Sequence, residues 1–351
     1  MLDFKSIFQE KTHNFSIYPR RFGIKEGKTH LYGPPKSGKT SLALLFAKEF
    51  KNPIYIHCKD PRNQRENIQK DLLKSFLEKR LDLLILDDYE PLFELPNIKN
   101  IILITSQPHC FIPQNFQSKA IAPLNFEEYI SINKNQTPIN QLLNTFIKEG
   151  NLPEILNTPD HLKVTKKQEL MQRIFQENYP IFQALLSFQS QNITIHQLYT
   201  YLKRSFKISK DKLYALLHSL QEQEFIHLLE HKTTKNSAKK LYFYDFSLPY
   251  AFSPEPNFQA IFENMVFFEL KSQFQNLLQA HHSAHFIYQN ILIFAIAFPN
   301  HIILDKLSQK YPQNHIVIIA LNPLKHPHCE VIDFISFALR EYQEQNVFFS
   351  K

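Results

Sequence analysis

The feature that most constrains the fold is a short glycine-bearing segment, Gly33-Pro34-Pro35-Lys36-Ser37-Gly38-Lys39-Thr40. The chain has 351 residues but only five glycines, and two of them lie in this segment. Residues 29–32 before it are typical of a short β-strand, and residues 41–48 after it are typical of a helix. Glycine permits backbone angles and close approaches that a Cβ would block. The sequence therefore predicts a strand, a tight loop and a helix in succession.

The order of residues in this loop matches G-x-x-x-x-G-K-[ST], the pattern of a phosphate-binding loop (P-loop, or Walker A). The N–H groups of such a loop converge on phosphate oxygens at the positive end of the helix dipole. Lys39 adds a positive charge for the β- and γ-phosphates, and the Thr40 hydroxyl is a ligand for Mg²⁺. We predict an ATP·Mg²⁺ site whose nucleotide-binding residues are Gly33, Pro34, Pro35, Lys36, Ser37, Gly38, Lys39, Thr40 and Ser41. The alternative is a glycine turn before an ordinary helix.

Two acids follow a second strand-like run. Residues 83–86 are apolar and lead directly into Asp87 and Asp88, the Walker B pattern. We predict that Asp87 binds Mg²⁺ together with Thr40, and that Asp88 polarises the attacking water. A further predicted strand, 101–105, ends in Thr105, a candidate sensor of the γ-phosphate. A polar cap at the strand end is an equally good interpretation of Thr105.

Six segments within residues 15–155, taken in order, resemble one protein family. The first three are 31–40, 54–62, which ends in Asp60-Pro61-Arg62, and the strand that ends in Asp87-Asp88. The other three are 101–106, 122–129, which contains Phe126-Glu127-Glu128-Tyr129, and Gly150-Asn151-Leu152-Pro153-Glu154. This region resembles an AAA-type P-loop ATPase family common in archaea and bacteria. The resemblance implies a parallel α/β sheet and a Mg²⁺-dependent ATPase. Relatives usually carry Glu where Asp88 stands, and a misplacement of about 1 Å can cost about a hundredfold in rate. Slow hydrolysis is therefore expected.

The middle of the chain is predicted to be helical. Helix-like runs at 168–177, 182–188, 195–206 and 210–223 precede strand-like runs at 225–230 and 239–245, which flank a basic loop at 232–240. Helices followed by a two-stranded wing predict a winged helix, a recurrent DNA-binding form. Cations gather near its second helix at Lys203, Arg204, Lys207, Lys210 and Lys212. Two interpretations stay open: a structural lid beside the ATPase, or an ATP-gated DNA-binding module.

The C-terminal part is predicted to be a small α/β domain. The sequence predicts a linker at 249–256, a helix at 258–278, strands at 285–288, 291–298, 301–304 and 315–321, and a helix at 331–342. Residues 242–245 and the run around Glu263-Asn264 resemble a restriction-nuclease-like module of the same ATPase family. The central strand, 291–298, has no acid, and Glu263 alone cannot hold a metal. We therefore expect a degenerate module that does not cut DNA.

The three parts of the chain described above define the predicted domains. We predict a P-loop domain at 1–160, a winged-helix domain at 161–248 and the nuclease-like domain at 249–351.

The net charge of +7 permits an acidic partner such as DNA. The sequence does not identify a protein partner. The longest apolar run, 291–298, is too short to span a membrane, and residues 1–19 lack a signal-peptide layout, so a cytoplasmic protein is expected. A zinc site built from His281, His282, His285, His326, His328 and Cys329 is less favoured than surface histidines.

Overall fold

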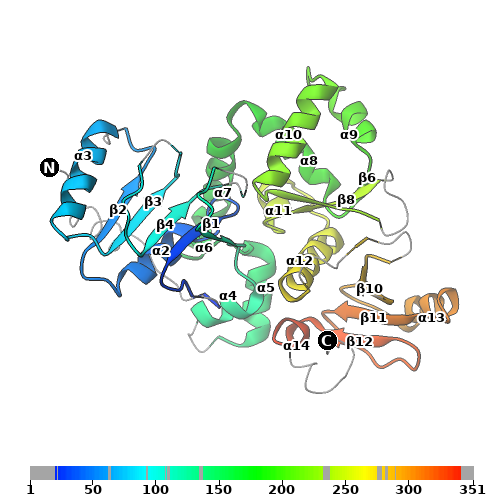
Figure 1. Ribbon diagram of the computed structural model, residues 1–351. Coiled ribbons are helices and arrows are strands. Elements are labelled where there is room, and N and C mark those ends of the chain that lie inside the picture. The colour runs from blue at the N-terminus through cyan, green and yellow to red at the C-terminus, as the bar shows by residue number, and fades with distance from the viewer. Residues whose placement is uncertain are drawn as a thin grey trace. The chain divides into compact units, whose positions relative to one another are not determined.

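The structure is a computed structural model. It describes residues 20–21, 23–61, 65–91, 94–106, 108, 111–133, 137–231, 238–274, 279–280, 284–288 and 290–340. The chain divides into two compact units. The first comprises 1–123 with 152–157 and 222–224, and the second comprises 124–151, 158–221 and 225–351. Figure 1 shows the helices and strands and labels them where there is room.

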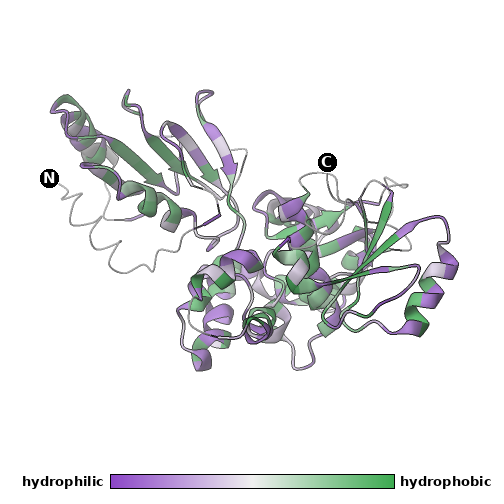
Figure 2. Ribbon diagram, turned by 90° about the horizontal axis from the view of Figure 1, so that it is seen from below, coloured by the Kyte–Doolittle hydropathy of each residue, from purple (hydrophilic) through white to green (hydrophobic). Residues whose placement is uncertain are grey.

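The first unit is an α/β fold around a parallel sheet. Its five strands run in the order β2-β3-β4-β1-β5. Their bounds are Pro53–His57 for β2, Leu83–Asp87 for β3, Ile101–Ile104 for β4, Lys28–Tyr32 for β1 and Gln117–Ala120 for β5. Every residue of β3 and β4 is buried, as expected for parallel strands covered on both faces. Figure 2 shows these central strands as hydrophobic. The predicted parallel sheet is confirmed.

Alternating side chains divide this sheet between two helices. Leu31, Tyr55, Leu83 and Ile85 pack in one cluster with Leu42 and Leu44 of α2 (Lys39–Ala47). Ile54, Ile56, Leu84 and Leu86 pack in a second cluster with Ile68 and Leu72 of α3 (Arg65–Leu77). Since successive residues of a strand point to opposite faces, the position of a residue in its strand decides which helix it meets.

The second unit begins with helices. They are α4 (Phe126–Ile132), α5 (Ile139–Glu149), α7 (Asp160–Phe175), α8 (Tyr179–Leu185), α9 (Ile195–Leu202) and α10 (Lys210–Glu222). The short α6 (Pro153–Leu156) belongs to the first unit. Strands β6 (Asn192–Ile193), β8 (Lys239–Phe243) and β7 (Ile226–Leu229) form an antiparallel sheet in that order. The predicted helices and hairpin strands are present, although the central part of the wing loop, 232–237, lies outside the described residues.

The rest of this unit is an α/β arrangement. Helix α12 (Phe258–Gln273) is followed by a four-stranded sheet with the order β12-β11-β10-β9. Its strands are β9 (Phe286–Tyr288), β10 (Ile291–Ala295), β11 (His315–Ala320) and β12 (Glu330–Asp333). Strands β10, β11 and β12 are parallel, and β9 is antiparallel to β10.

Three sequence predictions in this part are wrong. Residues 301–304 are not a strand but begin helix α13 (His301–Lys310), because Asn300 caps it through the Ile303 N–H and Leu304 meets the core. Residues 330–333 form β12 rather than a helix, and Asp333 caps the short α14 (Phe334–Ala338) only after that strand. The proline-rich stretch contains helix α11 (Leu248–Phe252), since Pro249 stands in its first turn, where proline is tolerated.

Candidate nucleotide-binding site

The predicted loop joins β1 to α2 in the first unit, so the strand, loop and helix order is confirmed. Gly33 has a φ of +134°, and a Cβ there would lie 2.5 Å from the carbonyl oxygen of Ile121. A side chain at this position would therefore push the loop away from the sheet. Lys39 is the first residue of α2, so the loop leads into a helix N-terminus.

The cations of the loop are held by neighbouring oxygens. Lys39 Nζ donates to the carbonyl oxygens of Gly33 and Pro34, each at 2.8 Å. Burial lowers the pKa of Lys39 to about 8. Lys36 Nζ lies 2.7 Å from a carboxylate oxygen of Glu154. Arg20 donates to the carbonyl oxygen of Ser37 at 2.7 Å. Three positive groups therefore lie at the loop, two of them on backbone carbonyl oxygens and one on a carboxylate.

The two predicted Mg²⁺ ligands meet. Thr40 Oγ1 donates to Asp87 Oδ2 at 2.7 Å, and the hydroxyl of Tyr55 donates to the same oxygen at 2.7 Å. Asp87 shares the α2 face of β3 with Leu83 and Ile85, so strand alternation aims its carboxylate at α2. A hydroxyl beside a carboxylate is a set of hard oxygen donors of the kind Mg²⁺ prefers, so these residues fit the metal.

The carboxylate of Asp88 is oriented away from that pair. Its backbone is left-handed, with φ +51°, and its N–H donates to Asp87 Oδ1 at 3.0 Å. Asp88 Oδ2 lies 3.2 Å from Nε2 of His57, and Oδ1 lies 3.8 Å from Nζ of Lys59. The hydrogen bond from His57, with a smaller contribution from the charge of Lys59, lowers the pKa of Asp88. Asp88 is therefore ionised at neutral pH.

Thr105 faces the other side of the sheet. It shares the alternation of Ile101 and Leu103, which pack with α3 rather than α2. Its hydroxyl lies 2.8 Å from Nε2 of His30, whose Nδ1 lies 3.0 Å from the hydroxyl of Ser118. Burial lowers the pKa of His30 to about 4, so this histidine is neutral in the sheet. The sensing role of Thr105 stays a prediction.

The sequence analysis missed several side chains of the site. They are Arg20, Tyr55, His57, Lys59 and Glu154. One signal was present: Tyr55 and His57 alternate at the end of a strand that is otherwise apolar, which aims both at one face. No local pattern marks Arg20. Glu154 ends the segment Gly150-Asn151-Leu152-Pro153-Glu154, but nothing in the sequence indicates that it pairs with Lys36 of the loop. Arg62 of the Asp-Pro-Arg segment lies outside the described residues.

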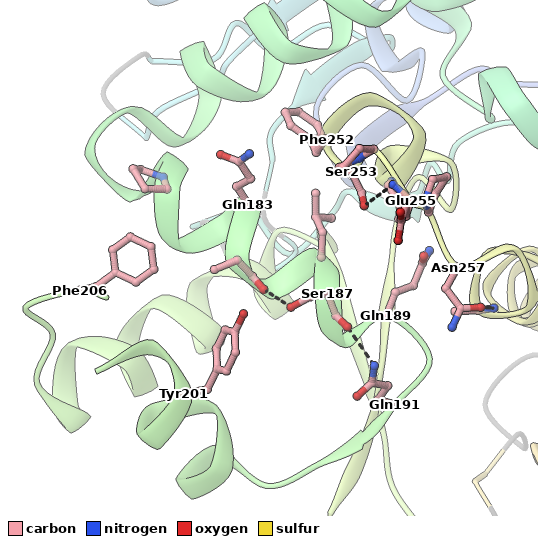
Figure 3. Close-up of a pocket in the computed structure, with 17 residues that line it drawn as sticks. Gln183, Ser187, Gln189, Gln191, Tyr201, Phe206, Phe252, Ser253, Glu255 and Asn257 are labelled. Carbon is pink, nitrogen blue, oxygen red and sulfur yellow. Dashed lines mark hydrogen bonds between the residues drawn. The ribbon is translucent and has the colours of Figure 1, made fainter. Parts of the chain in front are cut away.

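A separate cavity lies in the second unit. It has a volume of about 520 Å³ between α8, the end of α9 and the segment from α11 to α12. Figure 3 shows its lining, which includes Gln183, Gln191, Tyr201, Phe252 and Asn257. Glu255 is the one charged residue that lines it, so the cavity offers no cation to a phosphate. Of these two sites, only the loop of the first unit has cations among the residues that form it.

Two further findings concern the described part of the chain. No helix in it is both long enough and apolar enough to cross a lipid bilayer. Within the same residues no group of three or more His, Cys, Asp or Glu is arranged to hold a metal ion. His285 accepts the N–H of Ala295 at 3.1 Å, and His326 Nε2 lies 3.1 Å from Asp305 Oδ1. His281, His282 and Cys110 lie outside the described residues.

Comparison with known proteins gives distant similarities. No protein-family model matches the chain. It is 26% identical over 291 residues to "Uncharacterized protein MJ1544" of Methanocaldococcus jannaschii, a match that covers 69% of this chain. The same match covers 66% of the archaeal protein, so it spans slightly less than two thirds of that relative.

Three solved structures are similar in part. A STAND-class signal transduction ATPase with a tetratricopeptide repeat sensor, PH0952 from Pyrococcus horikoshii, is 18% identical with a TM-score of 0.29, over 74% of this chain and 47% of that one. AMPPCP-bound DnaA from Aquifex aeolicus is 16% identical with a TM-score of 0.32, over 62% of this chain and 86% of that one. Drosophila ORC bound to AT-rich DNA and Cdc6 is 10% identical with a TM-score of 0.22, over 69% of this chain and 87% of that one. At these values none of the three identifies an activity or a partner for this chain.

Proposed function

We propose that the chain binds ATP with Mg²⁺ and hydrolyses it slowly. The observation that carries this proposal is the contact between Thr40 and Asp87, 2.7 Å apart, directly after a glycine loop that runs into α2. Loop N–H groups and Lys39 would hold the phosphates. Thr40 and Asp87 would hold Mg²⁺, which supplies charge stabilisation at the γ-phosphate. Asp88, ionised and half-exposed, would accept a proton from the attacking water.

We further propose that the nucleotide state biases the second unit. Glu154 pairs with Lys36 of the loop, and both residues belong to the first unit. Gly150 and Asn151 precede this segment directly in the sequence and belong to the second unit. A phosphate that competes for Lys36 would release Glu154, and the short covalent connection would carry that change toward Asn151. Such a response is a population shift that depends on the γ-phosphate.

Direct titration tests the binding proposal. We expect ATP with Mg²⁺ to stabilise the protein against heat, because a ligand at about 100 times its dissociation constant adds about 2.7 kcal/mol. Removing Mg²⁺ with EDTA is expected to weaken the affinity about tenfold, and Asp87→Asn is expected to remove that Mg²⁺ dependence. Scanning calorimetry and isothermal titration measure both effects. A wild-type protein that shows no shift with ATP and Mg²⁺ contradicts the proposal.

We propose the three-domain division at 1–160, 161–248 and 249–351, with a C-terminal domain that does not cut DNA. All five residues of β10 are buried and apolar. Glu263 Oε1 lies 2.5 Å from Nζ of Lys240 and accepts the hydroxyl of Tyr242 at 2.8 Å. This carboxylate is therefore engaged inside the protein, where a nuclease would need it on a metal ion.

DNA binding is a second candidate function. Five exposed cations gather where α9 meets α10, in a segment that we call the turn. Lys203, Arg204 and Lys207 follow α9, and Lys210 and Lys212 lie at the start of α10. In the wing, by contrast, Lys239 pairs with Glu230 and Lys240 is buried against Glu263. Lys203 and Lys210 lie 5.7 and 5.6 Å from the ring centre of Tyr199. The turn, rather than the described part of the wing, would neutralise phosphates.

The salt dependence of duplex DNA binding tests this candidate. Each phosphate contact contributes a slope of about −0.9 to the logarithmic plot of affinity against salt. Lys203→Gln and Lys207→Gln are each expected to reduce the slope by about 1, whereas Lys239→Gln is expected to leave it unchanged. Fluorescence anisotropy with labelled duplex, with and without ATP, measures this. If the salt slopes of all variants equal that of wild type, these lysines do not contact DNA, and the middle segment is better interpreted as a structural lid beside the ATPase.

A further inference from the structure

The cavity of the second unit combines aromatic rings with uncharged hydrogen-bonding groups. Figure 3 shows the rings of Tyr201 and Phe206 on one side of it and Asn257 on the other. Amides and hydroxyls contribute to the rest of the lining, among them the side chains of Gln183 and Gln191. Its volume of about 520 Å³ lies in the range of sites that hold small organic groups. The cavity is therefore suited to a flat, uncharged ring with polar edges.

Positive charge gathers immediately outside this cavity, on its α9 side. The N–H of Arg204 donates to the carbonyl oxygen of Tyr201 at 3.2 Å, so this cation shares a helical turn with a ring of the lining. Lys207 directly follows Phe206 in the chain, and both cations are exposed. The charged residue of the lining, Glu255, lies in the segment from α11 to α12. A phosphate is therefore attracted to the α9 side and repelled by the Glu255 side.

We propose that this cavity binds a base of single-stranded DNA, while the phosphates next to that base lie on Arg204 and Lys207. This inference rests on the second candidate function, DNA binding through the turn, and does not depend on ATP hydrolysis. It assigns the base to the cavity and the sugar-phosphate backbone to the turn.

Tyr201 provides a fixed surface on which a base can stack. Its side chain is 44% exposed, and the edge of its ring contacts Phe188, with the ring centres 4.8 Å apart and an angle of 89° between the planes. This T-shaped contact holds the ring in place while leaving part of it open. Stacking on an aromatic side chain suits every base, because every base has a flat face.

The polar groups of the cavity match the edges of a base. A side-chain amide both donates and accepts hydrogen bonds, and so do the edges of the bases. In a duplex these edges are paired and the faces are stacked, so a base must leave the helix before it can enter a cavity. An unpaired strand has no such cost. The cavity therefore favours single-stranded DNA over the duplex.

Matched oligonucleotides test the proposal by fluorescence anisotropy. One is a labelled strand of about 12 deoxycytidines, and the other is an abasic strand with the same number of phosphates. We expect wild type to bind the normal strand at least about fivefold more tightly than the abasic strand, because only the normal strand can stack. Tyr201→Ala is expected to remove this preference, and Tyr201→Phe, which keeps the ring, is expected to retain it. Lys207→Gln is expected to weaken both strands equally and to reduce the salt slope by about 1.

Phe298→Ala is the matched control. Phe298 is 63% exposed and stacks on Phe258, so it is another exposed ring of the second unit that rests on one neighbour. This variant is expected to keep the preference of wild type. Damage to the fold by Tyr201→Ala would also lower binding of the abasic strand, and thermal unfolding measures it directly.

Three results overturn the inference while leaving phosphate contacts at the turn in place. They are equal affinity of wild type for the normal and abasic strands, equal losses in Tyr201→Ala and Phe298→Ala, and duplex binding as tight as that of the single strand. Competition by deoxycytidine monophosphate that matches the unlabelled strand, nucleotide for nucleotide, would assign the cavity to free nucleotides and also overturns it. Absence of binding to every oligonucleotide refutes the DNA-binding candidate itself, whereas ATP binding is unaffected by any of these outcomes.

Discussion

Replacing Lys39 with alanine is expected to reduce ATP affinity at least about a hundredfold while the fold survives. The ammonium group is the main positive charge at the expected position of the β- and γ-phosphates, and charge-assisted hydrogen bonds contribute about 1.5–3 kcal/mol each. Without nucleotide the same group donates to the carbonyl oxygens of Gly33 and Pro34. Burial lowers its pKa to about 8, which shows that the charged form is disfavoured there. Removing it therefore costs the free protein little.

Isothermal titration with a non-hydrolysable ATP analogue measures this effect, and thermal unfolding without ligand checks the fold. Lys48→Ala is the matched control, because Lys48 is exposed at the other end of α2. It is expected to bind as wild type does. Equal affinity in Lys39→Ala and Lys48→Ala would show that the loop does not hold the phosphates.

Replacing Gly150 with alanine is expected to destabilise the second unit by about 3 kcal/mol or more. Gly150 ends α5 with φ +81°, and a Cβ there would collide with Asp245 Oδ1 and Ser247 Oγ. Asp245 is fully buried and pairs with Lys167 Nζ at 3.0 Å. Breaking a buried ion pair costs about 3–5 kcal/mol, because the remaining charge stays uncompensated. The packing of Asp245 and Ser247 against Gly150 therefore explains why this position requires glycine.

Denaturant unfolding, followed by circular dichroism, measures this loss. Gly27→Ala separates strain from collision, since Gly27 also has a positive φ, +129°, but nothing lies within 4 Å of its added Cβ. That variant is expected to lose only about 1 kcal/mol. If both variants lose the same amount, the Asp245 contact is not what requires glycine at position 150.

The sequence by itself determined the local structure of the candidate nucleotide site. Two glycines followed by a lysine and a threonine, between an apolar strand and a helix, allow few other structures, because glycine tolerates the positive φ angles found at Gly33 and Gly38. The two acids after 83–86 could also be recognised from the sequence, since carboxylates at the carboxyl end of a buried strand lie at the edge of a parallel sheet, where Asp87 is found. The pairing of Thr40 with Asp87 followed from these two patterns.

Only the tertiary structure showed the partner of Asp88 and the backbone turn that directs it there. Asp87 and Asp88 look alike in the sequence, but strand alternation sends one to α2 and a left-handed turn sends the other to His57. The same alternation turns Thr105 toward His30, and residues 301–304 became helical through a cap at Asn300. The physical reason is common to these cases. Local patterns fix which backbone forms, whereas side-chain partners depend on register and sheet face, which are set by residues distant in the chain.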